Sequence, residues 1–562
     1  MVNTNLHTLD YIVFIVYFLI VATYGLWIYN KKRSKKISSA DYFLAEGSLT
    51  WWAIGASLIA SNISAEQFIG MSGSGFKIGL AIASYEWLAA LTLIIVAIFF
   101  IPVYLKNKIF TMPQFLNTRY NGTVSMIMAV FWLLLYVLVN LTSILYLGAL
   151  AINSISGINI TLCVLGLASF AVFITLGGMK VIGYTDVIQV FFLILGGLVT
   201  TYLALNLIGT HFGGTNILDN LALLKKNAGD HFHMILKKDS PNYVDLPGLS
   251  VLVGGMWIAN LNYWGCNQYI TQRALGADLK TARGGLLFAG FLKMIMPLIV
   301  VIPGIAAFVL FNNGSFHDQM IQQGELNPDR AYPVLLGLLP MGLKGLAFAA
   351  LTAAVVASLA GKANSISTIF TLDIYRKKIN PAADEKKLVM IGKITVVIAM
   401  ILAIVISPYL GIDKKGGFQY IQEYTGFVSP GVFAMFLLGF FWRKATSDAA
   451  LFATIGGFLI SLFLKFLPRF TDLSFLAPYG YSTNTGMVGG RPLYEIPFLD
   501  RMSIVFIICV LGMYIISMVQ NRKGLKVNAL EVDTKMFKVT PAFAIGALII
   551  CGIVAALYTI FW

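Results

Sequence analysis

The sequence has few charged residues, few cysteines and few histidines for its length. Charged residues make up 12% of the 562 residues, whereas hydrophobic residues make up 58%. Soluble globular domains carry about 25% charged residues, so this composition excludes a chain built mainly of soluble domains. The shortage of charge comes from apolar runs of about 20 residues, which recur from end to end and have the length of a bilayer-spanning helix.

The cysteines and histidines offer little for metal or catalytic chemistry. The cysteines are Cys163, Cys266, Cys509 and Cys551, and the histidines are His7, His211, His231, His233 and His317. The cysteines lie in or beside apolar runs without metal-site spacing, so we expect buried, inert thiols. The histidines all fall in expected outer segments, which excludes an intramembrane histidine relay and an HExxH metalloprotease. His231 and His233 leave a metal alternative open, although a solvated loop is favoured.

Neither an enzyme motif nor a nucleic-acid-binding pattern is present. The apolar runs contain no nucleophile–base pair, metal set or cofactor motif, so we expect a protein that is not an enzyme. The formal net charge is +15, but the basic residues do not cluster on one folded face. Segments expected in the cytoplasm carry about twice as many Lys and Arg as the outer segments, as the positive-inside rule requires. The charge therefore indicates topology and contact with anionic lipid, not nucleic-acid binding.

The apolar runs predict an all-α polytopic protein of the cell membrane with about fourteen transmembrane helices. They lie near 11–29, 51–72, 79–104, 124–153, 160–178, 185–209, 249–270, 284–311, 344–371, 388–410, 418–441, 449–467, 500–519 and 540–561. A basic cluster at 31–36 follows the first run, which is therefore not a cleavable signal peptide. The basic cluster places the N-terminus outside, and fourteen alternating spans then place the C-terminus outside as well. The polar stretches 210–248 and 468–500 are expected to be loops, and the sequence assigns no purpose to the second.

The stretch from Trp51 to Trp87 places polar groups where lipid does not tolerate them. Its first span turns polar near the middle, at Ser61, Asn62, Ser64, Glu66 and Gln67, passes Gly70, Gly73 and Gly75, and leads to a second span that carries Glu86. Polar side chains and a helix break at this depth occur only beside protein or a watery cavity. Each ionisable residue there costs about 2.5–3.5 kcal/mol on insertion scales, which predicts a functional site.

The span 249–270 repeats this pattern in the opposite orientation. It is apolar to Ala259 and then presents Asn260, Tyr263 and Asn267 at helical spacing. Two interrupted helices that cross the membrane in opposite directions are typical of an inverted-repeat transporter, whose substrate binds where they meet. The alternative is that these polar side chains only hold helices together.

Lys293 lies deep in the span 284–311 and needs a buried carboxylate partner, for which Glu86 is the best candidate. A mutually neutralised pair beside Asn and Gln side chains suits an uncharged ligand with many hydroxyls, because each hydroxyl both donates and accepts. The rings of Tyr85, Tyr263 and Phe418 are candidates to stack on the apolar face of a pyranose.

Three other spans carry polar residues with less certain roles. Asn140, Thr142 and Ser143 are expected to form interhelical hydrogen bonds. Gly177 and Gly178 are expected to end one helix, and Thr185 or Asp186 to begin the next. Asp186 is either an N-cap or a guide for a cation at the cytoplasmic mouth, and both readings stay open. In the span 344–371, Ala354, Ser358 and Lys362 share one helix face.

Long motifs in chain order resemble the sodium/solute symporter family. They are SLIASNISAEQFIGMSGSG, LAIASYEW, NLTSILYLG, TDVIQVFF, ANLNYWGCNQYITQR, STIFTLDIY and FQYIQEYTGFVSPG. The likeness covers nearly the whole chain and weakens in the outer loops and after about residue 445. It implies a LeuT-type fold within a single transporter domain, 1–562, with five-helix inverted repeats at 51–209 and 249–441 and accessory helices at 11–29 and 449–562.

The resemblance also implies the site residues. The sugar contacts fall on Asn62, Gln67, Glu86, Asn260, Lys293 and Gln422. Met71, Tyr85 and Phe418 match the outer gate, and Tyr263 matches the inner gate. The sodium ligands include the carbonyls of Ala60, Ile63 and Ala354 and the hydroxyl of Ser358.

Three positions depart from the family pattern. Ala89 replaces a serine that contacts the sugar, which leaves galactose versus glucose open. Ala357 removes one of two adjacent serine hydroxyls from the sodium site. Lys362 stands where relatives carry an apolar residue: its ammonium either occupies or opposes the sodium site, or its stem snorkels into the exit cavity. Four protein oxygens and a water still suit sodium, so retained coupling is favoured.

The sequence thus predicts a sodium-coupled symporter of a neutral monosaccharide of the galactose or glucose class. Sodium is the coupling ion, no other cofactor is expected, and the partners are the sugar, sodium and the lipid bilayer. The alternatives are a transporter with weakened or absent sodium coupling and a sugar sensor that binds without transport. The hexose, the sodium stoichiometry and the oligomeric state are not indicated.

Overall fold

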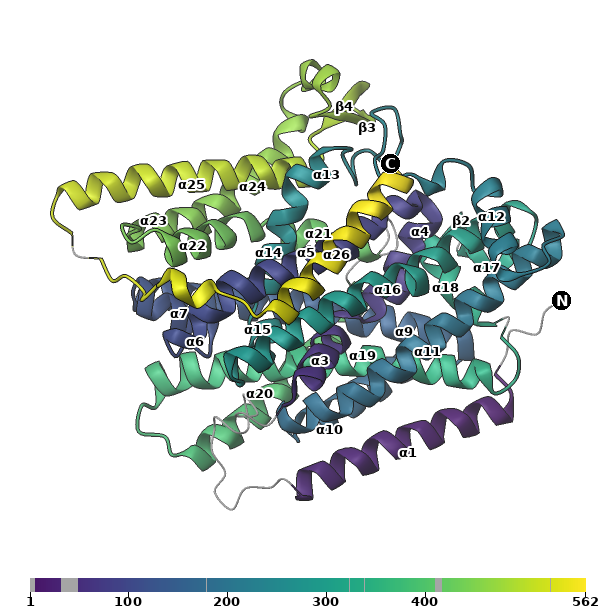
Figure 1. Ribbon diagram of the computed structural model, residues 1–562, viewed down its shortest axis with the longest axis horizontal. Helices are drawn as coiled ribbons and strands as arrows, with labels where there is room; N and C mark the ends of the chain where they lie inside the picture. The colour runs from purple at the N-terminus through teal and green to yellow at the C-terminus, as the bar shows by residue number, and fades with distance from the viewer. Residues whose placement is uncertain are drawn as a thin grey trace.

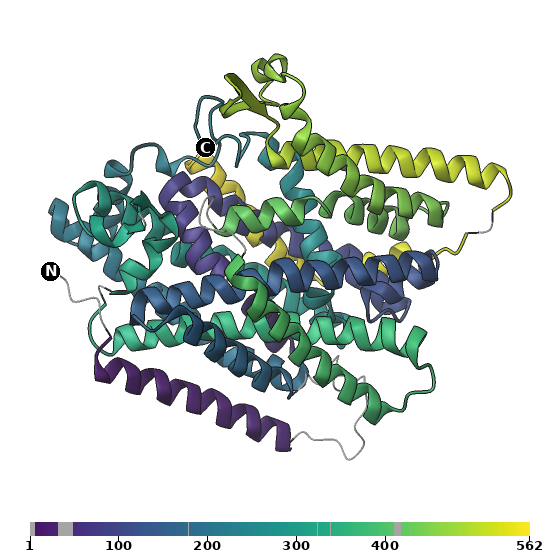
Figure 2. The same ribbon diagram turned by 180° about the vertical axis from the view of Figure 1, so that it is seen from behind.

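A computed structural model describes residues 6–31, 49–177, 179–322, 324–337, 339–409, 417–525 and 527–562. Within these ranges the protein is a bundle of long helices that run in a common direction, with a β-hairpin projecting from it (Figure 1, top). Figure 2 shows the same bundle from behind. The basic residues 32–36 and Gly178 lie outside the described residues.

The first part of the chain forms helices α1 and α3 to α12. Their bounds are α1 (Thr8–Lys31), α3 (Trp51–Asn62), α4 (Ser72–Ile78), α5 (Ser84–Ile95), α6 (Ile101–Lys106), α7 (Met112–Arg119), α8 (Gly122–Leu134), α9 (Thr142–Ser156), α10 (Ile160–Thr175), α11 (Met179–Phe212) and α12 (Ile217–Asn227). Wider π-helical segments at Val96–Phe100 and Leu135–Leu141 join α5 to α6 and α8 to α9 into continuous spans.

The second part forms the remaining elements. They are α13 (Ser250–Val253), α14 (Gly255–Gly265), α15 (Gln268–Leu275), α16 (Leu279–Asn312), α17 (His317–Met320), β1 (Ile321–Gln322), β2 (Glu325–Leu326), α18 (Ala331–Gly337), α19 (Leu343–Thr368), α20 (Glu385–Ile406), α21 (Gly417–Gly426), α22 (Ser429–Phe441), α23 (Ser447–Leu451), α24 (Gly457–Phe466), β3 (Thr483–Val488), β4 (Arg491–Glu495), α25 (Phe498–Arg522) and α26 (Pro541–Ile560). The strands pair antiparallel as β1–β2 and β3–β4.

The described residues contain ten helices that are long and apolar enough to cross a membrane. The pair α21 and α22, bent by 50°, forms a further candidate. The other predicted spans correspond to the shorter apolar helix α10 and to two broken helices, 51–78 and 250–275. The protein is therefore a multi-pass membrane protein, while the total number of spans and the side of each terminus stay predictions.

Both predicted interruptions are present. In the first, α3 ends at Asn62, Ile63 is extended, and the chain resumes helically at Glu66 as a π-helical segment, Glu66–Met71, that leads into α4. In the second, α14 ends at Gly265 and α15 begins at Gln268. The first break lies before the glycines, whose role is close packing: a Cβ at Gly70 would come within 2.6 Å of the Phe418 backbone nitrogen.

The structure corrects several local expectations. Helix α11 begins at Met179, so Thr185 and Asp186 lie inside it and neither is its N-cap. The stretch 210–248 contains α12. The stretch 468–500 contains the β3–β4 hairpin, whose strands pair antiparallel on either side of Gly489 and Gly490. Three cysteines are buried, but Cys551 is exposed.

His231 is not part of a solvated loop. Its ring stacks on Phe308 with a centroid separation of 3.8 Å, and its Nε2 lies 3.0 Å from the Phe76 carbonyl oxygen. Burial lowers the pKa of this histidine, although hydrogen bonding to the Phe76 carbonyl opposes the shift.

Candidate functional site

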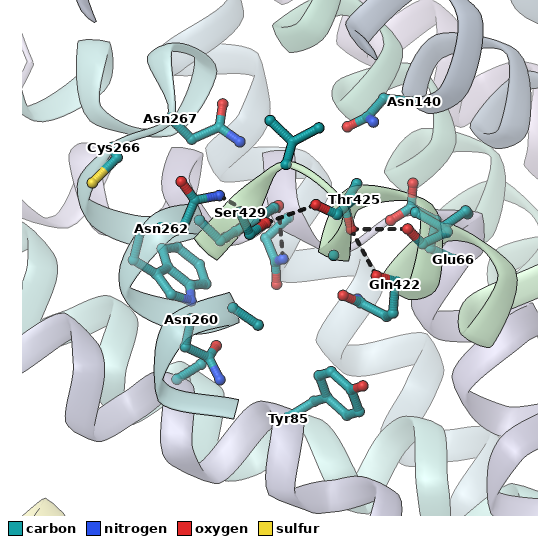
Figure 3. A pocket seen from close by; sticks show the side chains of 18 of the residues that line it. Glu66, Tyr85, Asn140, Asn260, Asn262, Cys266, Asn267, Gln422, Thr425 and Ser429 are labelled. Atoms are coloured by element: carbon teal, nitrogen blue, oxygen red, sulfur yellow. Dashed lines mark hydrogen bonds between the residues drawn. The ribbon is translucent and has the colours of Figure 1, made fainter. Parts of the chain in front are cut away.

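A cavity lies where the two broken helices face each other across α5, α16 and α21. Its lining includes both carboxylates and both lysines discussed below, together with amide and hydroxyl side chains from α14, α21 and α22, some of which are visible in Figure 3. Its free volume is about 80 Å³, below the roughly 300–1,000 Å³ of typical small-molecule sites. Ligand entry therefore requires the surrounding helices or side chains to move.

The predicted ion pair between Glu86 and Lys293 is present in this cavity. Helix α5 carries Glu86 and α16 carries Lys293, and the Lys293 Nζ lies 2.5 Å from the Glu86 Oε2. Lys293 also donates to the Asn62 Oδ1, at the end of α3. The side chains of both charged residues are at most 3% exposed, so the pair is desolvated and neutralises itself.

The other residues that the resemblance assigns to the sugar site also line the cavity. Gln67 comes from the π-helical segment, Asn260 from α14 and Gln422 from α21, and Ala89 follows Glu86 on α5. Gln67 Oε1 accepts from the Ser64 backbone N–H at 3.0 Å, which satisfies a backbone donor at the first break. Asn260 donates to the Met256 carbonyl. These positions place amides from three elements around one ion pair.

Two of the three predicted outer-gate residues meet over the cavity. The rings of Tyr85 and Phe418 pack edge to face with centroids 4.9 Å apart. The Tyr85 hydroxyl is buried and has no hydrogen-bond partner among the described residues. Met71 is fully buried at the end of its segment and does not line the cavity. The unsatisfied Tyr85 hydroxyl favours a ligand that hydrogen-bonds there.

Tyr263 links the two broken helices by hydrogen bonds. Its hydroxyl accepts from the Asn62 Nδ2 at 2.9 Å and pairs with the hydroxyl of Tyr269, on α15. Tyr136 donates to the Asn267 Oδ1 in the second break. Because Asn267 lies between α14 and α15, it does not continue the polar face of Asn260 and Tyr263, contrary to the helical spacing expected from the sequence.

The first break also carries the candidate sodium ligands. Ser358, on α19, donates to the Ser61 carbonyl at 2.7 Å and lies 3.5 Å from the Ala60 carbonyl. Ile63, Ala354 and Ala357 are fully buried beside this crossing. The last carbonyl oxygens of α3 have no hydrogen-bond partner within the helix and lie at the negative end of its dipole. Such oxygens are suitable ligands for a hard cation like sodium.

Lys362 lies one turn after Ser358 and is paired. Its Nζ is 3.4 Å from the Glu66 Oε1, and it lies 5.1 Å from the centroid of the Tyr269 ring. The lysine side chain is only 3% exposed. The snorkelling alternative is therefore wrong for this conformation, because a buried carboxylate is available as a partner.

Sequence reasoning did not assign several lining residues to the site. Asn262 donates to the Ser429 hydroxyl at 3.1 Å, and Ser429 and Thr425 form the next links of a chain of hydrogen bonds (Figure 3). Glu66, also visible there, was noted only as a polar residue at the break. The sequence around Glu66 does not indicate Lys362 as its partner, because the two residues are about 300 positions apart and only tertiary packing brings them together.

Asp186 lies outside the cavity, in a second buried cluster. It accepts from the Ser57 hydroxyl at 2.6 Å, and its Oδ2 lies 4.0 Å from an Arg273 nitrogen. Arg273, on α15, also donates to Ser57. The cluster joins α3, α11 and α15. Asp186 therefore has structural partners in Ser57 and Arg273, whether or not it also guides a cation.

Comparisons with known proteins agree with one another. Residues 42–457 match the sequence model of the sodium:solute symporter family. A sodium/glucose cotransporter of Vibrio parahaemolyticus is 45% identical and covers 100% of this chain and 99% of its own. A sodium/myo-inositol cotransporter 2 of Sus scrofa is 34% identical over 82% of this chain and 70% of its own.

A solved structure shares the fold. It is the substrate-bound, outward-open state of a Na+-coupled sialic acid symporter, with a TM-score of 0.75, 21% identity, and coverage of 91% of this chain and 98% of that chain. At this identity the likeness shows the arrangement of helices and not the ligand.

Proposed function

The chain belongs to the sodium:solute symporter family, and on that premise we propose that it carries a neutral monosaccharide of the galactose or glucose class across the cell membrane together with sodium. The observation that carries the substrate class is the buried Glu86–Lys293 pair among amide side chains. Because the pair neutralises itself, a charged ligand would leave one charge unbalanced in a desolvated site. A neutral polyol satisfies carboxylate, ammonium and amides together, since each hydroxyl donates and accepts.

The contacts proposed here are those that the resemblance implies, and all of them except Met71 line the cavity. Asn62, Gln67, Asn260 and Gln422 join the ion pair in binding the hydroxyls, and Tyr85, Phe418 and Met71 form the outer gate. Tyr263 is the inner gate, because its bonds to Asn62 and Tyr269 tie the two broken helices together. Ala89, one turn after Glu86, offers no hydroxyl to the sugar. Because one contact is missing, the protein accepts hexoses that differ in the orientation of one hydroxyl group.

The sodium ion is a co-substrate bound at the first break. Its ligands are the carbonyls of Ala60, Ile63 and Ala354 and the hydroxyl of Ser358, which takes the Ser61 carbonyl as its partner in this conformation. Ala357 supplies no hydroxyl. The Lys362 charge does not oppose the ion, because Glu66 compensates it at 3.4 Å. Sodium coupling is therefore retained.

The transport cycle follows from the two repeats. Residues 51–209 and 249–441 each begin with a broken helix, and helices 11–29 and 449–562 are accessory. Sodium bound at the first break favours the outward-open state, the sugar closes the outer gate, and the repeats rock about the cavity. Both termini lie outside. Each positive charge that moves inward with sodium contributes about 2.3 kcal/mol per 100 mV of membrane potential to the accumulation of sugar.

Purified full-length protein in proteoliposomes tests this function. Uptake of radiolabelled galactose and glucose is compared under inward sodium, potassium and proton gradients. The proposal expects accumulation that requires the sodium gradient, and myo-inositol, the solute named for the Sus scrofa relative, serves as a competitor. Equal uptake under the potassium gradient would contradict sodium coupling. Sodium-dependent sugar binding without uptake would show that the protein is a sensor and not a transporter.

A further inference from the structure

The connection between α25 and α26 packs against the end of the bundle that is expected to be cytoplasmic. Its residues 527–540, named here the strap, contain one short 3₁₀-helical turn, Thr534–Phe537. Figure 1 shows the strap, in yellow, beside α6 and α7. Its apolar side chains are buried or partly buried against the core: Leu530, Val532, Met536, Phe537 and Val539. The strap is therefore a packed element and not a free surface loop.

Asn107 and Arg119 bond the strap to α6 and α7. The Asn107 Nδ2 donates to the Glu531 carbonyl, and the Glu531 backbone N–H donates to the Asn107 Oδ1, both at 3.0 Å. Arg119 donates to the Asn528 carbonyl at 2.6 Å. The Arg119 guanidinium also donates to carbonyls at and just after the end of α22, those of Gly439, Trp442 and Ala445. One residue of α7 thus holds the strap and α22 together.

Arg283, near the start of α16, joins the strap to the α5–α6 span. Its guanidinium donates to the Lys538 carbonyl at 2.7 Å and to the Met536 carbonyl at 2.8 Å. It also donates to the Ala97 carbonyl at 3.0 Å, in the π-helical segment between α5 and α6. Arginine suits this position because its N–H groups form a rigid fork that serves several acceptors at once. The strap thus contacts helices of both proposed repeats: α6 and α7 of the first, and α16 of the second.

The helices under the strap also contact the second break. The Tyr104 hydroxyl, on α6, donates to the Gly265 carbonyl at 2.7 Å. The Met112 backbone N–H, at the start of α7, donates to the Gln268 Oε1 at 2.7 Å. Gly265 and Gln268 lie on the two sides of this break, and Tyr263 immediately before it is the proposed inner gate. Buried hydrogen bonds therefore connect the strap to the gate through α6 and α7.

The contact between Asn107 and Glu531 is the one that can separate at low cost. Glu531 is exposed and Asn107 is partly exposed, so water can replace their mutual hydrogen bonds. Arg119 and Arg283 are 1% and 8% exposed, and separation there would leave a buried cation without acceptors. Movement of α6 away from the strap is therefore expected to begin at Asn107.

We infer that the strap keeps the cytoplasmic side of the cavity closed, and that its bonds to Asn107 must break before sodium and sugar can leave on that side. The inference rests on the proposed function, since only alternating access requires this side to open. Each neutral hydrogen bond contributes modestly to stability, so two of them bias the equilibrium between closed and open forms without preventing the change. Asn107 is thus a positioning residue that acts through α6 and does not touch the ligand.

Reversible cross-linking of the full-length protein tests the inference. Lys106, on α6, and Glu531 form an exposed ion pair at 3.8 Å, so Lys106→Cys with Glu531→Cys places two thiols across the contact and leaves Asn107 in place. The parent carries Cys551→Ser, which removes the exposed natural thiol. A bifunctional methanethiosulfonate reagent joins the thiols, and a reductant releases them. Cross-linking should lower sodium-driven galactose uptake at least tenfold, retain sodium-dependent galactose binding, and be reversed by the reductant.

Asn107→Ala gives the converse test. Cys266, buried in the second break, lines the central cavity, so it reacts with a thiol reagent only when the cavity opens. In the Cys551→Ser parent, loss of both bonds to Glu531 should raise the rate of Cys266 modification at least threefold when a membrane-impermeant reagent is applied from the cytoplasmic side. The rate from the outer side should not rise. Asn117→Ala, at an exposed asparagine of α7, is the matched control and should leave both rates unchanged.

Uptake by the double-cysteine variant before cross-linking separates this inference from the proposed function. Undiminished uptake after complete cross-linking overturns the role of the strap alone. Equal rates of Cys266 modification in Asn107→Ala and Asn117→Ala also overturn it, as does inhibition of either single-cysteine variant by the same reagent to the same extent. Absence of sodium-driven uptake by the Cys551→Ser parent overturns the transport function and, with it, the need for a closed cytoplasmic side.

Discussion

Two buried ion pairs, Glu86–Lys293 and Glu66–Lys362, meet the same cavity from different helices. Each joins a residue of the first broken helix or of α5 to one on α16 or α19, at 2.5 Å for Glu86–Lys293 and 3.4 Å for Glu66–Lys362. Such pairs add little net stability, but removing one partner leaves an uncompensated charge that costs about 3–5 kcal/mol. Their roles differ because of their neighbours: Asn62 joins the first pair, whereas the second lies one helical turn from Ser358.

Glu86→Gln is expected to abolish sugar binding and to lower the midpoint of thermal unfolding. The glutamine leaves the Lys293 ammonium unpaired in a dry site, which costs about 3–5 kcal/mol. The double variant Glu86→Gln with Lys293→Met should recover most of the unfolding midpoint but not the binding. Thermal unfolding in detergent and labelled-sugar binding measure the two effects. Sugar affinity unchanged in Glu86→Gln would show that the carboxylate does not contact the ligand.

Lys362→Met is expected to tighten the apparent affinity for sodium by about tenfold, because an unpaired Glu66 carboxylate near the first break attracts the ion. The matched variant Lys362→Met with Glu66→Gln removes both charges and should return the sodium dependence to that of the wild type. Initial uptake rates against sodium concentration report the effect. Loss of sugar binding in the double variant would instead show that the lysine has a direct role in holding the sugar.

The residue-scale predictions from sequence succeeded where chemistry demanded a partner. Lys293 needed a carboxylate at its own depth, and Glu86 was available. Lys362 had the same need, but Glu66 was not identified, because the two helices that bring them together cross only in the folded chain. The helix start at Asp186 was predicted wrongly, since a favourable N-cap residue was also a favourable partner for Ser57.

At the scale of elements, glycines set the distance between the first broken helix and its neighbours. A Cβ at Gly70 would meet the Phe418 backbone at 2.6 Å, one at Gly75 the Val301 carbonyl at 2.8 Å, and one at Gly304 the Ser72 carbonyl at 2.1 Å. Gly79, with φ of +87°, ends α4 in a conformation that L side chains rarely adopt. The sequence indicated a break here, but it did not distinguish glycines that break a helix from glycines that let helices touch.

Gly70→Ala is expected to reduce sodium-driven uptake at least tenfold, because the added methyl group pushes the Phe418 segment of α21 out of its gate position. Gly166→Ala is the matched control, since a Cβ there meets no atom within 4 Å. That variant should retain uptake and gain up to about 1 kcal/mol of helix stability. Equal uptake by both variants would contradict the role given to the Gly70 contact.

The segment around His231 predicts a pH dependence of stability. Burial lowers the folded-state pKa of this histidine, whereas the unfolded value is about 6.5. Its contribution is therefore fully present above about pH 6.5 and is lost as the pH falls toward the lowered folded value, because the unfolded chain then binds the proton first. The unfolding midpoint should fall more between pH 7.5 and 5.5 in the wild type than in His231→Gln. The exposed His211→Gln control should follow the wild type, and identical profiles for all three would contradict the prediction.

At the scale of the whole molecule, the fold class followed from composition and from polar residues at mid-membrane depth. Apolar runs locate helices reliably because lipid allows few other structures. The same rule gives no information about the segments outside lipid, where the β3–β4 hairpin and α12 were expected to be loops. It also gives no information about a cavity of about 320 Å³ between the hairpin, α21 and α25, since residues of both strands form part of its wall.

Equilibrium binding of labelled galactose to the purified full-length protein tests the central claim most directly. The claim is that the two helix breaks enclose a self-neutralised cavity that recognises a neutral sugar and is coupled to sodium. We expect binding at least tenfold tighter in sodium chloride than in potassium chloride, and loss of that tight binding in Glu86→Gln and in Asn260→Ala. Tight binding that persists in both variants, or that is the same in the two salts, would contradict the account.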